Sequence, residues 1–322
     1  MSFQDSGGVV SDSLEDLTID NITSHVIHMS TQIDDARVKH LTTKLIQYLH
    51  DYVRDVQLQT DEWEVAWKFL TQVGQTCTPE RQEFVLLSDV LGVSALVDAI
   101  NSKQTAAATE SSVLGPFFNE ASKVFENGQS ITSNEVVGEP MLIRGRILNT
   151  AGKGIQDVLV DIWETDGNGF YDMQDPEYNE PDCRGKFVTD HDGRFFLKAV
   201  KPVDYPIPND GPVGQILRLF NRDCRRPAHV HYMITHPEYE KLVTAVYLSE
   251  SQFILEDPVF GTKKSLVVDC TWTEDEALAK VYQISPFERD IDNETRRGFW
   301  LLDRDFVIVQ KTSQENRKTF DP

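Results

Sequence analysis

The spacing of apolar residues changes along this 322-residue chain, and the change predicts a helical first part followed by a β-rich part. Apolar side chains recur at helical spacing over residues 33–56, and a second helix is expected around residues 63–70. A third helix is expected to begin with Thr78 as its cap and Pro79 as its first residue, and to run to residue 92. This first part of the chain is therefore expected to be α-helical.

From residue 141 onward, apolar and polar residues alternate, which predicts β-strands. Turn sequences rich in glycine, asparagine and aspartate separate the strands. The candidate strands are Met141–Ile147, Val158–Glu164, Lys186–Thr189, Arg194–Val200, Ala228–Ile234, Leu242–Leu248, Ser265–Cys270 and a final strand over Phe299–Val309. Many short strands joined by turns predict an antiparallel β-sandwich, so the fold class is expected to be α+β.

The segment between the two parts sets the expected domain boundaries. Residues 113–118 are expected to form an ordered loop because they contain a Gly-Pro pair. Residues 1–20 are acidic and rich in serine, and are expected to be a disordered tail. The sequence thus predicts a helical domain over 21–110 and a β-sandwich domain over 111–322.

Charge and composition narrow the possible partners. The formal net charge of −21 would repel phosphate backbones and anionic lipids, so neither nucleic acid nor a membrane is expected as a partner. No apolar run is long enough to span a membrane, and the N-terminus does not resemble a secretory signal. The cysteines are scattered without a CxxC pair, at Cys77, Cys183, Cys224 and Cys270. A disulfide framework or a zinc ribbon is therefore not expected. The protein is expected to be cytoplasmic.

A pair of histidines offers the first candidate chemistry. His229 and His231 are two residues apart in a predicted strand, so both side chains project from one face, as a chelating pair requires. An isolated pair of this kind more often consists of one buried, hydrogen-bonded histidine and one surface histidine than of two metal ligands. A ferrous site of the cupin type would need an acidic residue shortly after the pair, and Glu238 comes too late in the sequence.

Two tyrosines add oxygen donors to this picture. Tyr171 follows an Asp-Gly-Asn-Gly turn, and Tyr205 precedes a Pro-Ile-Pro segment that cannot be a central strand. Each tyrosine could also be half-buried, with its hydroxyl on a polar partner. A phenol has a pKa near about 10, so it binds a cation as phenolate only if the cation lowers that pKa. Ferric iron can do so, whereas zinc prefers cysteine, histidine and carboxylate.

Other site classes are not supported by the motifs. The turn before Tyr171 is not an EF-hand calcium loop, because Phe170 and Tyr171 stand where that loop needs Asp or Asn and then Gly. The sequence contains neither a G-x-S-x-G nucleophile elbow nor a phosphate-binding glycine loop. A non-catalytic β-sandwich binding module, in which the tyrosines and histidines are structural, stays open as the alternative to a metal-dependent oxygenase.

The order of three motifs resembles the intradiol ring-cleaving dioxygenases of catechols. The motifs are Gly-Phe-Tyr171, then Tyr205-Pro-Ile-Pro-Asn-Asp-Gly-Pro-Val-Gly, then Arg226-Pro-Ala-His229-Val-His231. The similarity extends from the first predicted helix to the segment that begins at Val259, which is most of the chain. The resemblance implies a non-haem Fe(III) held by Tyr171, Tyr205, His229 and His231. It also implies a β-sandwich catalytic domain, and a helical N-terminal domain that forms a homodimer around a lipid-binding tunnel.

The resemblance also implies roles in catalysis for two residues. Tyr205 would be a displaceable phenolate that accepts a proton from the diol, and O2 would be the co-substrate. Arg226 would stabilise negative charge on the ring. Arg226 could instead be a structural arginine paired with one of the chain's 52 acidic residues.

Within the family, three stretches most resemble the enzymes that cleave hydroxyquinol to maleylacetate. They are Leu86-Leu-Ser-Asp89-Val-Leu-Gly, residues 113–118 and Val259-Phe-Gly-Thr. The substrate-pocket residues implied are Leu86, Asp89, Val113, Leu114, Gly115, Pro116, Ile207 and Pro208.

Asp89 would accept a hydrogen bond from the third hydroxyl of hydroxyquinol, and the flanking apolar residues argue against an exposed position on the helix. Leaving a buried acceptor unpaired with plain catechol would cost on the order of 1–3 kcal/mol. Catechol, which gives cis,cis-muconate, is the alternative substrate. One departure from bacterial relatives is Ala245, which stands where they carry a polar glutamine or histidine.

Overall fold

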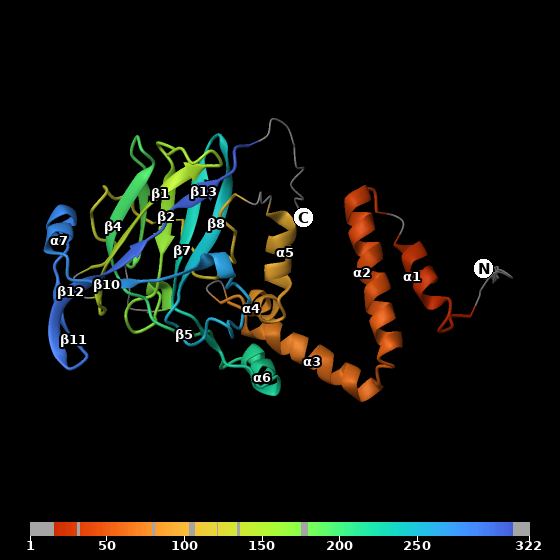
Figure 1. The fold of residues 1–322 in the computed structure, drawn as a ribbon. Coiled ribbons are helices and arrows are strands. Elements are labelled where there is room, and N and C mark those ends of the chain that lie inside the picture. The colour runs from red at the N-terminus through yellow and green to blue at the C-terminus, as the bar shows by residue number, and fades with distance from the viewer. Residues whose placement is uncertain are drawn as a thin grey trace, which may run out of the picture. The chain divides into compact units, whose positions relative to one another are not determined.

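The computed structural model describes residues 16–30, 33–78, 81–102, 107–120, 122–133, 136–174 and 180–311. The chain divides into two compact units, with the boundary after Leu70 (Figure 1). The predicted tail falls largely outside the described residues, and the predicted domain boundary at residue 110 stays a prediction. Among the described residues, no helix has the length and apolar character needed to cross a membrane.

The first helices agree with the predicted helical part. They are α1 (Ile22–Met29), α2 (Ala36–Asp55) and α3 (Thr60–Thr76). Helix α2 begins at a true cap, because the Asp35 carboxylate accepts hydrogen bonds from the N–H groups of Arg37 (2.7 Å) and Val38 (2.8 Å). The predicted helices over 33–56 and around 63–70 are therefore confirmed as α2 and α3. Helix α1 was not predicted.

The third predicted helix starts later than expected. It is α4 (Glu83–Val90), which Gly92, in the left-handed conformation with φ 74°, separates from α5 (Val93–Asn101). Thr78 does not cap a helix: its backbone N–H donates to the carbonyl of Arg81 (2.8 Å), and its hydroxyl accepts from the N–H of Arg81 (3.0 Å). The two residues close a turn, so the predicted start was wrong, and Pro79 lies outside the described residues.

The second unit contains a sandwich of two sheets (Figure 1). The six-stranded sheet consists of β1 (Pro140–Asn149), β4 (Arg194–Val200), β10 (Thr271–Thr273), β11 (Phe287–Ile291), β12 (Glu294–Asp303) and β13 (Phe306–Ile308). The five-stranded sheet has the order β3 (Arg184–Val188), β2 (Leu159–Trp163), β7 (His229–His236), β8 (Tyr239–Leu248) and β9 (Val267–Val268). A two-stranded ribbon pairs β5 (Tyr205–Pro206) with β6 (Arg225–Arg226).

Side chains from both sheets share one core, which confirms the predicted sandwich. Val160, Ile162 and Val230 of the five-stranded sheet belong to the same buried cluster as Ile143 and Leu197 of the six-stranded sheet. Most strand pairs are antiparallel, but β1 pairs in parallel with β12 and β13, and β8 pairs in parallel with β9. The fold class α+β is therefore confirmed, with three parallel pairings added to the expected antiparallel ones.

The predicted final strand is interrupted between β12 and β13. The Asp305 carboxylate accepts a hydrogen bond from the backbone N–H of Arg146 (2.9 Å), a bond that a strand carbonyl would otherwise accept. The chain also approaches β1 closely here, because a Cβ at Gly145 would lie 1.8 Å from the carbonyl oxygen of Arg304. A side chain that binds the neighbouring backbone thus breaks the ladder into two strands.

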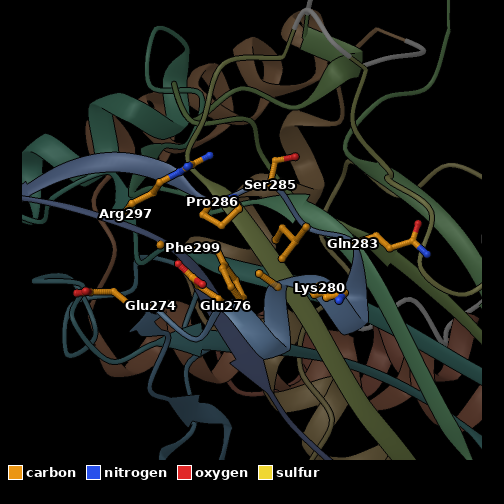
Figure 2. Close-up of a pocket in the computed structure, with 11 residues that line it drawn as sticks. Glu274, Glu276, Lys280, Gln283, Ser285, Pro286, Arg297 and Phe299 are labelled. Atoms are coloured by element: carbon orange, nitrogen blue, oxygen red, sulfur yellow. The ribbon is translucent and has the colours of Figure 1, made fainter.

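Two further helices were not predicted. They are α6 (Pro212–Leu219) and α7 (Glu276–Tyr282), both short. A cavity of about 460 Å³ opens beside α7 and β12 (Figure 2). Its lining carries both signs of charge, with Glu274 and Glu276 beside Lys280 and Arg297. None of the sequence-predicted site residues lines it.

Candidate metal centre

Four buried side chains converge in the second unit. They are the four that the resemblance to the family predicted as metal ligands. The hydroxyl oxygen of Tyr171 lies 3.4 Å from that of Tyr205 and 3.4 Å from Nε2 of His229. Nε2 of His229 lies 3.0 Å from Nε2 of His231. All four side chains are almost fully buried.

These separations fit a single cation held in common. Metal–nitrogen and metal–oxygen bonds of about 2 Å place neighbouring donor atoms roughly 3 Å apart. The two separations of 3.4 Å that involve Tyr171 are longer than the directed hydrogen bonds of about 2.7–3.0 Å expected between these groups without a cation, whereas the two imidazole nitrogens lie 3.0 Å apart. In the part of the chain that the structure describes, no group of three or more His, Cys, Asp or Glu side chains could hold a metal ion. A metal at this cluster would therefore depend on the tyrosines.

Strand β7 positions both histidines. His231 pairs with Trp163 of β2 on one side and Ala245 of β8 on the other, and its ring stacks on Trp163 at 4.9 Å between ring centroids. Nδ1 of His229 donates to the carbonyl of Pro227 (2.7 Å), which leaves Nε2 as the lone-pair atom facing the cluster.

The protonation state of the histidines suits a ligand role. Burial, together with the positive charge of Arg226, lowers the pKa of His229 well below its usual range. Burial, followed by the charges of His229 and Arg226, lowers the pKa of His231 in the same way. Both imidazoles are therefore neutral at physiological pH, which is the form that coordinates metals.

The loop before Tyr171 depends on one glycine. Gly169 has φ 86°, and a Cβ there would lie 2.9 Å from Cβ of Tyr205, so the two tyrosine-bearing loops can approach only because this residue has no side chain. The Asp166 carboxylate accepts hydrogen bonds from the N–H groups of Asn168 (2.9 Å) and Phe170 (2.9 Å) and closes the turn.

The buried ion pair of Arg184 and Asp172 supports the other side of Tyr171. The Tyr171 ring stacks on Phe117 at 4.3 Å between ring centroids. Arg184 donates to the Phe117 carbonyl (2.9 Å) and to the Asp172 carboxylate (2.6 Å), so one guanidinium fixes both the stacking partner and the residue after Tyr171. Burial raises the pKa of Tyr171 well above its usual value, so this side chain is a neutral phenol unless a cation stabilises its anion.

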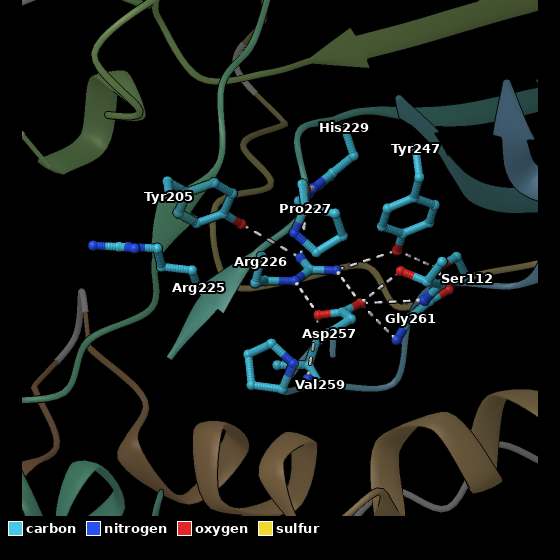
Figure 3. A network of polar contacts seen from close by, with 12 residues as sticks. Ser112, Tyr205, Arg225, Arg226, Pro227, His229, Tyr247, Asp257, Val259 and Gly261 are labelled. Carbon is cyan, nitrogen blue, oxygen red and sulfur yellow. Dashed lines mark hydrogen bonds and ion pairs between the residues drawn. The ribbon is translucent and has the colours of Figure 1, made fainter. Parts of the chain in front are cut away.

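Tyr205 reaches the cluster from the β5–β6 ribbon, where it is paired directly with Arg226. The Asp204 carboxylate accepts a hydrogen bond from the N–H of Ala228 (2.8 Å), which ties this loop to the start of β7. Nη1 of Arg226 lies 3.4 Å from the Tyr205 hydroxyl and 3.2 Å from Nε2 of His229 (Figure 3). The buried guanidinium therefore borders the proposed ligands directly.

The predicted pocket residues come from three segments. Leu86 and Asp89 are buried on α4, and Ile207 is buried in the loop after β5. The 113–118 segment contains no helix or strand, as predicted. In it, Gly115 lies against His231, since a Cβ at Gly115 would be 3.6 Å from His231 Nε2.

The remaining predicted pocket residues differ in exposure. Val113 is buried beside Gly261, and Pro208 is half-buried. Leu114 and Pro116 are exposed at the outer end of the same loop. The buried members therefore lie on α4 and in two loops, and the exposed members lie at the surface of one of these loops.

Asp89 carries a carboxyl group into this buried region. Burial raises the pKa of Asp89, while a hydrogen bond with Ser94 and the charge of Arg226 partly counter the effect. Asp89 is therefore close enough to Arg226 for their charges to interact. An acidic side chain of this kind can accept a hydrogen bond from a bound molecule.

Two family models match the chain, the N terminus of catechol dioxygenase at residues 35–109 and a dioxygenase model at residues 113–286. The chain is also 42% identical over 303 residues to the intradiol ring-cleavage dioxygenase hqdA of Aspergillus niger, a match that spans 94% of this chain and 88% of that protein. The chain belongs to the intradiol ring-cleavage dioxygenase family. Members of this family are generally non-haem iron enzymes.

Other relatives of this intradiol dioxygenase are similar over most of their length. A hydroxyquinol 1,2-dioxygenase of Rhizobium sp. is 40% identical over 289 residues, which cover 88% of this chain and 93% of that protein. The crystal structure of hydroxyquinol 1,2-dioxygenase from Pseudomonas putida DLL-E4 superimposes with a TM-score of 0.80 at 36% identity, over 91% of this chain and 99% of that one. The predicted family and fold are thus confirmed.

Several residues around the centre of this intradiol dioxygenase were not predicted. Trp163 and Phe117 stack on proposed ligands, and Arg184 supports Phe117. Asp257 and Tyr247 bind Arg226. Trp163 and Tyr247 lie in predicted strands and Phe117 lies in the predicted ordered loop, but nothing in the sequence marks these aromatic residues as neighbours of the centre. Asp257 is one acidic residue among many, and its partner is distant in sequence.

Proposed function

We propose that this intradiol dioxygenase binds ferric iron and cleaves hydroxyquinol with O2 between its adjacent hydroxyls, giving maleylacetate. The proposed ligands are Tyr171, Tyr205, His229 and His231. The observation that carries the proposal is the spacing of their donor atoms, 3.0–3.4 Å in a buried site. Both atoms of O2 enter the product, so the reaction balances without another co-reactant.

The proposed reaction divides the work between the iron and the chain. Ferric iron, when bound, would hold the two adjacent hydroxyl oxygens and draw electron density from the ring. This would make the ring reactive toward O2. The diol must lose two protons to bind as a dianion; the Tyr205 phenolate would accept one of them, and water would accept the other. Arg226, which is always charged, stabilises the negative charge that the ring then carries.

The substrate follows from the third hydroxyl of hydroxyquinol. Asp89 is buried and interacts with the charge of Arg226, which supports a role as the acceptor for that hydroxyl. Catechol lacks the hydroxyl, so the Asp89 carboxyl would keep its hydrogen bond with Ser94 but have no substrate partner. The similarity to two proteins named hydroxyquinol 1,2-dioxygenase supports the same substrate.

Oxygen uptake by the iron-loaded protein tests the proposal. Hydroxyquinol and catechol are compared side by side, with the autoxidation of hydroxyquinol subtracted, and the product is identified from its absorbance. Faster uptake with hydroxyquinol, giving maleylacetate, is expected. Faster uptake with catechol would contradict the substrate and favour cis,cis-muconate as the product. No uptake with either diol would contradict the catalytic role and favour a binding module.

The helical part supports a homodimer. Helix α2 contains no buried residue, yet it carries a row of exposed apolar side chains at helical spacing, including Leu41, Leu45, Tyr48 and Tyr52. We propose that a second copy of the chain covers this row, with a lipid at the helical interface, and that the protein is cytoplasmic. Sedimentation should give twice the 36.6 kDa chain mass, and Leu45→Asp should reduce it to a single chain. Native mass spectrometry tests for the lipid.

A further inference from the structure

Arg226 is held by a set of contacts on the side facing away from the proposed iron ligands. Its Nε donates to Oδ1 of Asp257 (3.1 Å), and its Nη2 donates to Oδ2 of Asp257 (3.3 Å) and to the Tyr247 hydroxyl (3.1 Å). Both Asp257 and Tyr247 are buried. The remaining nitrogen, Nη1, is thereby directed at Tyr205 and His229 (Figure 3).

Asp257 is itself fixed by the backbone that follows it. Its carboxylate accepts hydrogen bonds from the N–H groups of Val259 (3.3 Å), Gly261 (3.0 Å) and Thr262 (3.2 Å). Although burial acts to raise it, the charge of Arg226 and these hydrogen bonds hold the pKa of Asp257 below its usual value. Asp257 therefore stays charged and offsets the buried guanidinium.

The donor and acceptor of each hydrogen bond beyond Tyr247 can be assigned in only one way. The hydroxyl of Ser112 donates to the carbonyl of Gly261 (2.8 Å) and lies 3.0 Å from the Tyr247 hydroxyl. A serine hydroxyl has a single proton, so Ser112 must accept from Tyr247, and Tyr247 must accept from Arg226. The chain of donors runs from Arg226 through Tyr247 and Ser112 to the backbone of Gly261, with each hydroxyl used once as donor and once as acceptor.

Gly261 provides the space in which this arrangement exists. A Cβ at this position would lie 2.5 Å from the Tyr247 hydroxyl and 2.9 Å from Nη2 of Arg226. Gly261 is not among the residues with positive φ, so its backbone conformation does not require glycine. The absence of a side chain is needed only because the tyrosine hydroxyl and the guanidinium occupy that volume.

Strand β8 carries Tyr247, with its hydroxyl group, two residues after Ala245. The two residues lie on the same face of β8, where Ala245 is paired with His231 and Tyr247 is paired with His229. Ala245 has no polar side-chain atom to contribute. The hydroxyl two residues further along the strand is the polar group that β8 offers at this face.

We propose that Asp257 and Tyr247 are positioning residues that aim Nη1 of Arg226 at the iron ligands, and that Gly261 is required to admit the Tyr247 hydroxyl. This inference rests on the proposed function, because it assumes that Arg226 acts on the substrate. It adds three residues to the site, none of which contacts the proposed iron ligands through its own polar atoms in the described contacts.

The first test is whether Tyr247 acts through Arg226. Tyr247→Phe should lower kcat for hydroxyquinol by about tenfold with little change in KM, since one hydrogen bond that orients the guanidinium is lost. The same change made in Arg226→Ala should have no further effect. Equal losses in both backgrounds, or no loss in either, would overturn the inference. Tyr239→Phe, elsewhere on β8, is the matched control and should behave as wild type.

The Arg226→Ala protein also distinguishes a failure of the proposed role of Arg226 from a failure of the positioning role of Tyr247. Wild-type kcat in Arg226→Ala would overturn the proposed role of Arg226, and the positioning inference with it. A strong loss in Arg226→Ala combined with wild-type kcat in Tyr247→Phe would overturn the inference alone.

The second test uses the space at Gly261 and does not need the Arg226 variant. Gly261→Ala should lower kcat by displacing the Tyr247 hydroxyl and the guanidinium. Adding Tyr247→Phe removes the closest clash and leaves the one with Nη2 of Arg226 at 2.9 Å, so the double variant should recover part of the way toward Tyr247→Phe alone. A double variant as slow as Gly261→Ala would overturn the inference. Gly74→Ala is the control, because a Cβ there would meet its nearest atom at an ordinary 3.6 Å.

The third test is independent of turnover. Ferric iron affinity of the metal-free protein is measured by competition with a chelator. Asp257→Asn removes the charge that offsets Arg226 and should weaken iron binding by about 10- to 100-fold, whereas Tyr247→Phe should leave it nearly unchanged. Wild-type affinity in Asp257→Asn would overturn the role of Asp257. Thermal unfolding of each metal-free variant identifies losses that come from folding.

Discussion

The two faces of strand β7 carry different kinds of side chain. On one face, Nε2 of His229 lies 3.0 Å from Nε2 of His231 and 3.4 Å from the Tyr171 hydroxyl, which lies 3.4 Å from the Tyr205 hydroxyl. On the other face, Val230, Tyr232 and Ile234 belong to the core of the sandwich. Side chains alternate along a strand, so residues joined by one peptide bond lie in two environments. Charged groups on the two faces differ in whether they have an ion-pair partner.

Rows of paired residues extend the difference across the sheet. The row on the site face is Arg184, Trp163, His231 and Ala245, and the next row, on the core face, is Gly185, Ile162, Tyr232 and Thr244. Arg184 on the site face is bonded to Asp172 and to the Phe117 carbonyl. Among the described residues, buried polar atoms without a hydrogen-bond partner occur on both faces, at Tyr232 and Glu164 on the core face and at Trp163 and His231 on the site face. The difference concerns ion pairs: Arg184 on the site face has one, with Asp172, whereas Glu164 on the core face has none among the described residues.

The largest effect should come from removing a proposed ligand. Tyr171→Phe deletes one hydroxyl from the site face and should lower oxygen uptake by about 10³-fold or more, with loss of bound iron. Tyr232→Phe deletes a hydroxyl from the core face of β7 and should change neither. Uptake and iron content per chain are measured together. Full activity in Tyr171→Phe would contradict the ligand assignment.

The buried ion pair on the site face should give the next effect. Arg184→Ala leaves Asp172 buried without its partner and should destabilise the metal-free protein by about 3–5 kcal/mol in urea unfolding. Activity should fall as well, because Phe117 and the Tyr171 turn lose their support. Lys68→Ala breaks an exposed pair with Glu64 on α3 and should cost at most about 0.5 kcal/mol. A similar small change in Arg184→Ala would contradict its structural role.

A substitution on the core face should change the unfolding free energy and not the turnover rate. Ile234→Ala removes buried apolar volume and should cost about 2–5 kcal/mol of unfolding free energy. The turnover of each folded molecule should stay as in wild type, since no polar contact of the site is lost. Leu255→Ala, at an exposed position, should change stability by less than about 0.5 kcal/mol. A loss of kcat in Ile234→Ala at full iron loading would show that the two faces are coupled.

The sequence was sufficient to predict the faces of β7, but not the contacts around them. Period-two spacing predicts that His229 and His231 share a face, and motif order carried the resemblance to the family. The partners of Arg226 could not be predicted, because Asp257 is 31 residues away and lies in a loop whose course depends on tertiary packing. Arg184 and Asp172 are closer in sequence, yet nothing in their spacing distinguishes a buried ion pair from an exposed one.

Helix boundaries show the same limit. Thr78 and Pro79 have the types expected at a helix start, but Thr78 forms a turn with Arg81 and the helix begins at Glu83. Glu83 is completely buried and accepts a hydrogen bond from the N–H of Val213 at the start of α6 (3.1 Å). A contact with a residue far along the chain therefore competes with the local signal, and no local pattern contains that information.

The unpartnered acid on the core face predicts a pH-dependent stability. Burial raises the pKa of Glu164 well above its usual value, and the backbone of Val200 acts in the opposite direction without reversing the shift. The folded protein therefore keeps this proton above the pH at which the unfolded chain releases it, and wild-type stability falls as pH rises above that point. The glutamine in Glu164→Gln does not titrate. The gain in unfolding free energy of this variant over wild type should therefore be absent near pH 4 and should grow by up to about 1.4 kcal/mol per pH unit above pH 5.

Urea unfolding of the metal-free proteins at several pH values measures this difference. An advantage of Glu164→Gln that is equal at pH 4 and pH 8 would contradict a protonated Glu164. Arg226 on the site side retains its charge through Asp257, whereas Glu164 has no such partner and is expected to be neutral.

The smallest effect concerns selectivity at Asp89. Replacing this buried acceptor with leucine should lower the ratio of kcat/KM for hydroxyquinol to that for catechol by about tenfold, because hydroxyquinol loses a partner and catechol no longer leaves one unpaired. Asp89→Asn retains an acceptor oxygen and should lower the ratio less. An unchanged ratio in Asp89→Leu at normal iron content would mean that the third hydroxyl is recognised elsewhere. Because Asp89 also interacts with the charge of Arg226, a fall in kcat for both diols would instead assign it to the support of the guanidinium.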